Sequence, residues 1–233
     1  VFPLEWIDPH THNSSRGYRE DGYFAESMIN FLALLGWNSG SEQEIFTLSE
    51  LVNSFDLERV HKSGARFDPE KIKWFNHHYM QKQSTQHLGD LFKNSQDELS
   101  EVSNQYIEAV VDLIKERATF VTDFWELSSF FFVNPDTYDA KALKKTLKED
   151  TFDLMRSLLI VLNTTDAGSK KAIEQSVKDW ILSKNIGFGR IMMPLRLALV
   201  GALKGPDVFD IIYMIGLDKT IHRINKFITK SNT

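Results

Sequence analysis

The chain has 233 residues and no cysteine. This composition excludes disulfide bonds and thiolate zinc sites, and it fits a reducing compartment such as the cytoplasm. No stretch approaches the roughly 18 consecutive apolar residues that a membrane-spanning helix needs. The start, VFPLEWIDPH, lacks the basic and apolar regions of a signal peptide. We therefore expect a cytoplasmic protein without a membrane partner and, because the first residue is valine, a processed or expressed fragment.

Sequence motifs of catalytic centres are also missing. The chain contains no glycine-rich phosphate loop, no GxSxG and no HExxH. The pairs His10/His12 and His77/His78 have no third ligand at a clear spacing, whereas a zinc site needs three or four ligands. We therefore predict neither a catalytic residue nor a metal site in this chain.

Apolar residues at helical spacing dominate the sequence, and alternating strand-like runs are scarce. Thr47 and Glu50 form a capping-box pattern, and Asp68-Pro69 is typical of a helix start. We expect one long helix near 96–117. Further helices are expected from about Leu51 onward and near 24–36, 69–79, 139–149, 151–162, 169–184, 193–204, 206–215 and 218–230. The predicted fold class is all-α, with at most a short strand pair in the first twenty residues.

Two breaks in this pattern suggest domain boundaries. The polar stretch MQKQSTQH separates two apolar segments near Ser84, so we expect a helical region over 1–84 and a second domain over 85–233. The turn-forming residues near Asn134 suggest a subdivision of the second domain.

Charge is unevenly distributed along the chain. The net charge is −5, but the residues from Lys170 onward include eleven basic and five acidic side chains, a local charge of +6. The first 169 residues therefore carry −11. This asymmetry indicates either a polyanionic partner for the C-terminal part or an ordinary solvated basic face.

Four cations lie at helical spacing near the end of the chain: Lys219, Arg223, Lys226 and Lys230. Such a stripe is suited to following a phosphate backbone. Lysine is also favoured near helix C-termini for electrostatic reasons alone, so a solvated face remains the alternative.

Two arginines are the other candidates. Arg196 lies in the apolar stretch RIMMPLRLALVGALKGPDVF, which begins at Arg190. Its charge requires either an internal partner, such as Asp179 or Asp210, or a position at the rim of a groove that faces a phosphate or base. Arg117 ends the predicted long helix, where it either interacts with the helix dipole or offers its planar fork to a base edge.

Gly205-Pro206 follows Arg196 in the sequence. We expect Gly205 to close one helix and Pro206 to begin the next. Such a corner is suited to packing on an unstacked base, although most corners of this kind are only structural.

Five collinear blocks resemble the bacterial-type glutamyl-tRNA synthetases, a family of class I aminoacyl-tRNA synthetases. They are GYREDGYFAESMINFLALLGW (17–37), EIFTLSELVNSFDLERV (44–60), ARFDPEKIKWFN (65–76), KERATFVTDFWELSSFFF (115–132) and the segment 190–209. The resemblance implies a stem-contact helical region followed by an anticodon-binding helical cage. It also implies that the chain is the C-terminal, non-catalytic half of such an enzyme, since the HIGH-type and KMSKS-type nucleotide-binding motifs are absent.

The resemblance also assigns roles to single residues. Arg117 matches an arginine that recognises the last anticodon base, and Arg196 matches another arginine that contacts the anticodon. Gly205, Pro206 and Val208 match a corner that packs on anticodon bases, and Gly205 stands where some members have threonine. Lys178 stands where other members have arginine. The candidate tRNA-binding residues are Arg117, Lys178, Arg190, Arg196, Gly205, Pro206, Val208, Lys219, Arg223 and Lys226.

The predicted function is therefore tRNA binding and anticodon recognition within a glutamate–tRNA ligase. The fragment alone is not expected to be catalytic and needs no cofactor, while ATP and Mg²⁺ are expected for the full-length enzyme. The expected partner is tRNA-Glu, with no DNA, and a monomer is expected. The alternative is a helical protein-interaction or scaffold module that is related to the family but does not bind RNA.

Overall fold

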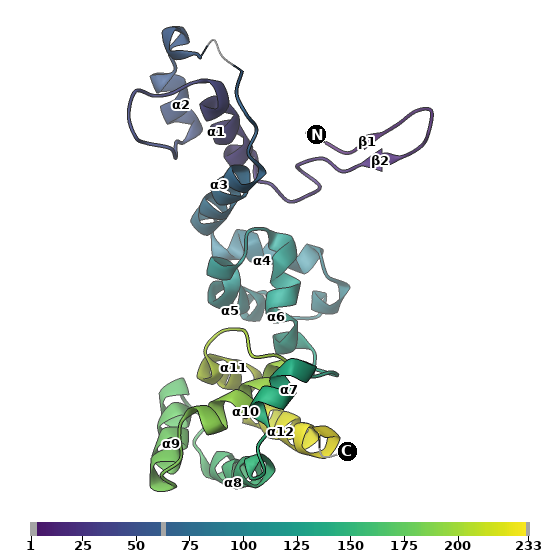
Figure 1. Ribbon diagram of the computed structural model, residues 1–233, viewed down its shortest axis with the longest axis vertical. Helices are drawn as coiled ribbons and strands as arrows, with labels where there is room; N and C mark the ends of the chain where they lie inside the picture. Colours follow the sequence, from purple (N-terminus) through teal and green to yellow (C-terminus); the bar gives the residue numbers. More distant parts are fainter. Residues whose placement is uncertain (1–3, 62–63, 232–233) are drawn as a thin grey trace. The chain divides into compact units, whose positions relative to one another are not determined.

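The computed structural model describes residues 4–61 and 64–231, and it is organised as two compact units, 1–127 and 128–233. Within the described ranges the structure contains twelve α-helices, short 3₁₀ turns and one pair of two-residue strands (Figure 1). The all-α fold and the short strand pair at the start are therefore confirmed.

Unit 1 begins with an antiparallel hairpin of β1 (Trp6–Ile7) and β2 (Ser14–Ser15), which extends away from the helices of this unit (Figure 1). Its helices are α1 (Ala25–Gly36), α2 (Leu48–Ser54), α3 (Pro69–Lys82), α4 (Thr85–Asn94) and α5 (Asn104–Ile114). Four 3₁₀ turns connect them: η1 (Leu57–Arg59), η2 (Asp97–Leu99), η3 (Lys115–Arg117) and η4 (Val121–Asp123). The helix α6 (Phe124–Phe132) contains the division between the units.

Aromatic packing between α1 and α3 forms part of the core of unit 1. Phe31, Ile72, Phe75 and Tyr79 are buried together, and α1 packs along α3. The two predicted helix starts that frame this core are confirmed. Thr47 and Glu50 form a complete capping box at α2, and Asp68 caps α3 ahead of Pro69. These caps fix where the helices begin, because they satisfy backbone N–H groups that the first turn leaves unpaired.

Unit 2 is built on α7 (Ala140–Thr146), α8 (Thr151–Thr164), α9 (Lys170–Ser183), α10 (Gly189–Val200), α11 (Val208–Ile215) and α12 (Leu217–Ser231). The helix α10 packs against α7, α8, α11 and α12, and α9 packs against α8 and α11. Leu195, Leu197, Ala198 and Leu199 of α10 are fully buried. The apolar stretch around Arg196 is therefore the central helix of this unit.

The structure corrects three helix predictions. The long helix expected over 96–117 is interrupted, because Ser103 caps a new start at α5 and the residues around 97–99 form the separate turn η2. The helices α4 and α6 were not predicted. Finally, α10 ends before Gly201 rather than at Gly205.

Gly201 explains this early end of α10. It has a φ of +83°, and a Cβ there would lie 2.7 Å from the carbonyl oxygen of Thr137. A side chain would therefore be strained by both the backbone conformation and the contact. Asp207, not Pro206, then caps α11, and the connection between the two helices spans 201–207.

The division between the compact units does not coincide with the expected boundary at Ser84. Ser84 caps α4, and α3 and α4 belong to the same unit. The structural division lies within α6, closer to the subdivision expected near Asn134. A boundary of function near Ser84 stays a prediction.

Candidate nucleic-acid interface

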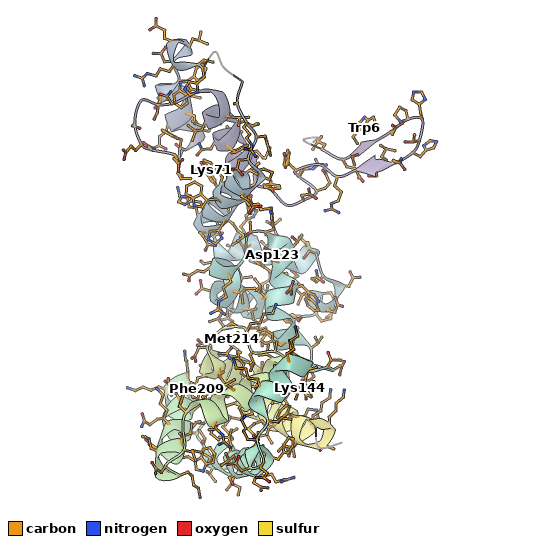
Figure 2. The ribbon with its side chains drawn as sticks, viewed as in Figure 1. Trp6, Lys71, Asp123, Lys144, Phe209 and Met214 are labelled. Atoms are coloured by element: carbon orange, nitrogen blue, oxygen red, sulfur yellow. The ribbon has the colours of Figure 1, made fainter. Side chains whose placement is uncertain are left out.

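A hollow of about 470 Å³ opens on unit 2 beside α9, α10 and α11. Among the predicted residues, Lys178, Arg196 and Val208 line it together. The complete lining is Lys145, Glu174, Lys178, Phe188, Met192, Met193, Arg196, Leu203, Asp207, Val208 and Phe209. Phe209 and Val208 are both 2% exposed, so they form part of an apolar base (Figure 2 labels Phe209). The hollow therefore combines basic side chains with apolar surface.

Arg196 is held against the backbone at the edge of this hollow. Its Nη1 donates a hydrogen bond to the carbonyl oxygen of Pro206 at 2.6 Å. Gly205 has a φ of +131°, and a Cβ built on it would lie 3.5 Å from Arg196 Nη1. Because glycine tolerates this positive φ, the backbone can turn here so that the Pro206 carbonyl oxygen faces the Arg196 guanidinium.

The two acids considered as internal partners of Arg196 are engaged elsewhere. Asp210 pairs with Lys170 Nζ at 2.7 Å, and this hydrogen bond raises the pKa of Lys170 above its usual value. Asp179 accepts a hydrogen bond from Gln175. Arg196 itself is half-buried, and the Pro206 carbonyl is one of the groups that hold its guanidinium.

Lys178 lies on α9 and forms an ion pair with Glu174 at 2.5 Å, one turn earlier. Both side chains line the hollow, and the Lys178 side chain is 46% exposed. An exposed pair of this kind is weak, because water screens the charges. A phosphate that entered the hollow would therefore compete readily with Glu174 for the ammonium group.

Sequence reasoning missed Phe188, Met192, Met193 and Lys145 at the same hollow. Phe188 is 46% exposed and stands between two glycines just before α10. An exposed aromatic ring beside cations is suited to stacking on an unpaired base. The only signal in the sequence was an aromatic residue flanked by glycines, which no helical or strand pattern explains.

Pro206 and Val208 do not present their side chains as freely as expected. Pro206 is buried, and Val208 forms part of the lining of the hollow with little exposure. Gly205 is half-buried and lies next to the guanidinium of Arg196. The groups near this corner that are accessible to a ligand are therefore the Arg196 side chain and the open space in front of Val208.

The expected cationic stripe on α12 is wrong in the described structure. Arg223 is only 2% exposed, and it donates to Asn134 Oδ1 at 2.8 Å, to the Leu199 carbonyl at 2.8 Å and to the Val133 carbonyl at 3.3 Å. It therefore ties α12 to α10 and to the segment that follows α6. Helical spacing shows which side chains share a face, but it does not show which loop packs against that face.

The next two cations of the stripe contact the same segment. Lys226 Nζ donates to Asp136 Oδ1 at 2.9 Å, which lowers the pKa of Asp136 below its usual value, and Lys230 donates to the Asp136 carbonyl. Lys219 is exposed, and its side chain makes no hydrogen bond or ion pair with the described residues. The RNA contacts predicted for Lys219 and Lys226 stay predictions, but a continuous solvated stripe does not exist.

Arg190 is exposed at the start of α10, where it pairs with Asp150 and does not line the hollow. The structure therefore brings together Lys178, Arg196, Gly205, Pro206 and Val208. It does not bring Arg190, Lys219, Arg223 or Lys226 to the same place.

Arg117 belongs to unit 1 and ends the turn η3. It is exposed, and among the described residues its side chain makes no ion pair or hydrogen bond. The planar guanidinium is thus accessible to a ligand. A hydrogen-bonding group that accepts bidentate contacts, such as a base edge, matches its geometry.

The segment that carries Arg117 is fixed by three side chains of α3. Gln81 Nε2 donates to the Lys115 carbonyl at 2.7 Å, and His77 Nδ1 donates to the Ala118 carbonyl at 2.7 Å. Asn76 Nδ2 donates to the Thr119 carbonyl at 2.7 Å and is fully buried. Sequence reasoning missed this support, because the partners are 34 to 43 residues apart along the chain.

The histidines and carboxylates considered for metal binding are dispersed. His77 supports the Arg117 segment, and His78 stacks on Trp74, where burial lowers the pKa of His78. Over residues 4–61 and 64–231 no group of three or more metal-ligating side chains comes together. In the same ranges no helix has the length and apolarity needed to cross a membrane.

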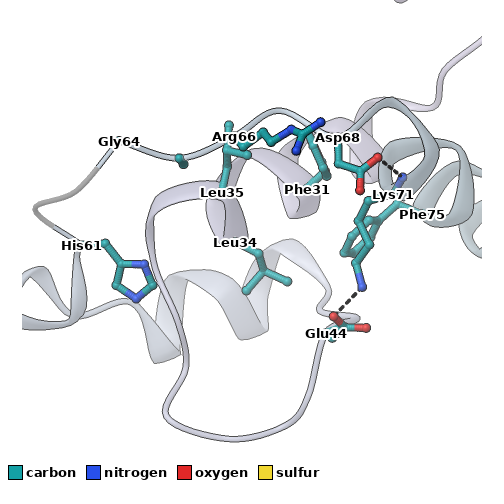
Figure 3. Close-up of a pocket in the computed structure, with 11 residues that line it drawn as sticks. Phe31, Leu34, Leu35, Glu44, His61, Gly64, Arg66, Asp68, Lys71 and Phe75 are labelled. Carbon is teal, nitrogen blue, oxygen red and sulfur yellow. Dashed lines mark hydrogen bonds and ion pairs between the residues drawn. The ribbon is translucent and has the colours of Figure 1, made fainter.

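A second hollow, of about 300 Å³, lies in unit 1 (Figure 3). The Lys71 ammonium points across it and pairs with Glu44 at 2.5 Å. Asp68 lines it as well, but its Oδ1 accepts the backbone N–H groups of Glu70 and Lys71 at the start of α3. The Lys71 and Asp68 charges are thus engaged within unit 1, and we assign no ligand to this hollow.

Comparison with known proteins identifies two family matches. The family described as "Anticodon binding domain" matches residues 66–228, and the family "tRNA synthetases class I (E and Q), catalytic domain" matches residues 8–74. The second match shows that the first helices resemble part of a catalytic domain, whereas the sequence reading placed 1–84 after that domain.

Individual relatives agree with these matches. The chain is 51% identical over 227 residues to a glutamate–tRNA ligase of Christiangramia forsetii, covering 97% of this chain and 45% of the relative. A solved glutamate tRNA ligase of Elizabethkingia meningosepticum matches with a TM-score of 0.92 and 44% identity, covering 98% of this chain and 46% of that chain. The corresponding structure from Elizabethkingia anophelis has a TM-score of 0.88 and 44% identity, covering 98% and 45%. The chain thus spans just under half the length of these relatives, and it belongs to the anticodon-binding domain family, in the branch found in glutamate–tRNA ligases.

Proposed function

We propose that this chain is the tRNA-binding and anticodon-recognising portion of a glutamate–tRNA ligase. The observation that carries the proposal is the hollow of unit 2. It lies inside the range that matches the anticodon-binding family and combines Arg196, Lys178 and an apolar base. The substrate of the whole enzyme would be tRNA-Glu, charged with glutamate by a catalytic portion that uses ATP and Mg²⁺. We expect a cytoplasmic monomer.

The hollow suits an unpaired base of an RNA loop. A base that left its stack would cover the exposed Phe188 ring and the Val208 side, while Arg196 would donate to a base edge or phosphate. The hydrogen bond to the Pro206 carbonyl holds Arg196 in position before the RNA arrives, so less side-chain entropy is lost on binding. Lys178 adds a charge that attracts phosphate without fixing a geometry.

Arg117 would discriminate between tRNAs at a second contact, which belongs to unit 1 rather than to the hollow of unit 2. Its guanidinium is exposed on a segment that Gln81, His77 and Asn76 fix. The family resemblance assigns recognition of the last anticodon base to this position, which is the base that separates tRNA-Glu from tRNA-Gln. We propose that role for Arg117.

The scaffold alternative makes a different prediction about salt. Phosphate contacts release counterions, so the logarithm of the tRNA association constant should fall with the logarithm of salt concentration by about 0.7 per single-strand phosphate contacted. We expect a slope of about −2 or steeper for tRNA-Glu in a filter-binding titration of the chain from 50 to 300 mM salt. A slope near zero would favour the scaffold module, and equal binding to any polyanion would reject anticodon recognition.

Arg117→Ala is expected to reduce discrimination. Affinity for tRNA-Glu should fall about 5- to 150-fold, by analogy with the ~1–3 kcal/mol of a bidentate base contact. Affinity for a tRNA-Glu with a changed last anticodon base should fall much less, because the lost contact is specific to that base. Competition binding of the two tRNAs measures this ratio. Arg117→Lys is the control: it keeps the charge and removes the fork, so preserved discrimination in this variant would reject the assigned role.

A further inference from the structure

Unit 1 exposes an apolar patch on α1 and α2 that the proposed tRNA contacts do not use. We call Ile29, Leu48, Val52 and Phe55 the α1–α2 patch. These side chains are 41%, 58%, 68% and 52% exposed, respectively. With Ala33 and the buried Leu51 they line a hollow of about 300 Å³. Contiguous exposed apolar surface of this kind marks an interaction site.

The spacing of apolar residues along α2 explains why the side chains of the α1–α2 patch are exposed. Leu51 points inward and is 7% exposed, while Leu48, Val52 and Phe55 recur at steps of four and three on another side. The capping box of Thr47 and Glu50 fixes the start of this short helix, so its orientation is set locally. The helix therefore has two apolar sides, of which unit 1 covers only one.

The composition of the patch argues against RNA as its occupant. All six residues that line the hollow are apolar. Phosphate recognition needs cations, and base recognition needs hydrogen-bonding groups beside an aromatic ring; the lining offers the ring of Phe55 but neither cations nor hydrogen-bonding side chains. An apolar protein surface is the matching partner.

The family comparison indicates which protein surface this is. The patch lies within residues 8–74, the range that matches the class I catalytic domain. A domain buries its apolar surfaces within its own core. The chain covers 45% of the length of its relatives, so most of such a catalytic domain lies outside it.

We propose that the α1–α2 patch is the surface on which the catalytic portion of the ligase packs. This inference rests on the proposed function, because it takes the chain as one portion of a glutamate–tRNA ligase. It adds a specific contact surface to that assignment. In the whole enzyme, the patch would be buried and would link the anticodon-reading helices to the portion that charges the tRNA.

The absence of cysteine allows a direct test of burial. Val52→Cys introduces a single thiol on the patch. The reaction rate of this thiol with a maleimide is measured by mass spectrometry of the labelled peptide. It is compared between the chain alone and a full-length chimera, in which the chain replaces the matching part of the Elizabethkingia anophelis ligase. We expect the thiol to react at least tenfold more slowly in the chimera.

Leu182→Cys is the matched control. Leu182 is 75% exposed on α9 of unit 2, so its thiol should react at similar rates in both proteins. Equal reactivity of the Val52 thiol in the chain and the chimera would overturn the proposal. The Val52 thiol of the chain alone could also become protected as the protein concentration rises, with a dimer detected by mass. That result would make a second copy of the chain the occupant of the patch, and it would overturn the proposal too.

The proposed function is tested separately from this contact. Val52→Cys should leave tRNA binding by the chain unchanged, because the patch carries no RNA contact. Failure of the unmodified chain to bind tRNA would reject the function whatever the thiol shows. Normal tRNA binding with an unprotected thiol would reject only the docking surface.

Discussion

Arg223→Ala is expected to lower the free energy of unfolding of unit 2 by about 2–4 kcal/mol, the range for losing a large buried side chain and several buried hydrogen bonds. The side chain is 2% exposed, and it satisfies Asn134, the Leu199 carbonyl and the Val133 carbonyl. Its removal would leave buried acceptors without partners and a space between α12 and α10. Hydrogen exchange of peptides from α10 and α12 measures the loss locally, which avoids treating two units as one transition.

Lys219→Ala, one turn earlier on the same helix, is the control. Lys219 is exposed, so stability should change by no more than about 0.5 kcal/mol. Arg223→Lys should recover little, since a single ammonium group on a different stem cannot reproduce the geometry of a guanidinium. An alanine variant of Arg223 that keeps its stability but loses tRNA binding would restore the original prediction of an RNA contact and contradict the structural role.

This residue shows where sequence reasoning fails. The spacing of Lys219, Arg223, Lys226 and Lys230 correctly indicates one side of a helix. It does not reveal that the segment 133–136 packs there, because those contacts join residues about 90 positions apart. Local signals of helix position cannot specify such long-range packing.

Sequence patterns whose residues lie within one helical turn of each other predicted the structure correctly. The caps at Thr47 and Asp68 depend on neighbouring residues only, and both are found where the sequence places them. Helices with weak patterns were missed. The first turn of α4 is polar, and α6 reads FWELSSFFF, which is apolar almost throughout and has no clear periodicity. The end of α10 was misplaced because Gly201 and Gly205 are both reasonable stops, and only the approach of Thr137 distinguishes them.

The candidate site could be predicted only in part from the sequence, because some of its residues belong to local patterns and others do not. Arg196 stood out because a charge within an apolar helix needs an explanation, and the structure supplies the Pro206 carbonyl as its support. Phe188 was missed because an exposed aromatic residue in a loop has no periodic pattern. Its value as a stacking surface becomes visible only when the hollow brings it near Arg196 and Lys178.

Arg196→Ala is expected to weaken tRNA-Glu binding about 10- to 100-fold, or ~1.4–2.7 kcal/mol, the range for losing a charge-assisted contact at a partly buried site. The variant removes the guanidinium that lines the hollow and lies beside Gly205, while the apolar base of Val208 and Phe209 remains. Filter binding at fixed salt measures the loss. Hydrogen exchange of α10 and α11 checks that the lost bond to the Pro206 carbonyl has not unfolded the corner.

Arg190→Ala provides the matched comparison, because it removes the same charge from the same helix. Arg190 pairs with Asp150 and lies outside the hollow, so we expect less than about a threefold loss of affinity, as for a screened surface charge. Non-specific attraction would weaken equally in the two variants, whereas a base or phosphate seated in the hollow depends on Arg196 and not on Arg190. Equal losses would therefore show that net charge, rather than the hollow of unit 2, holds the RNA.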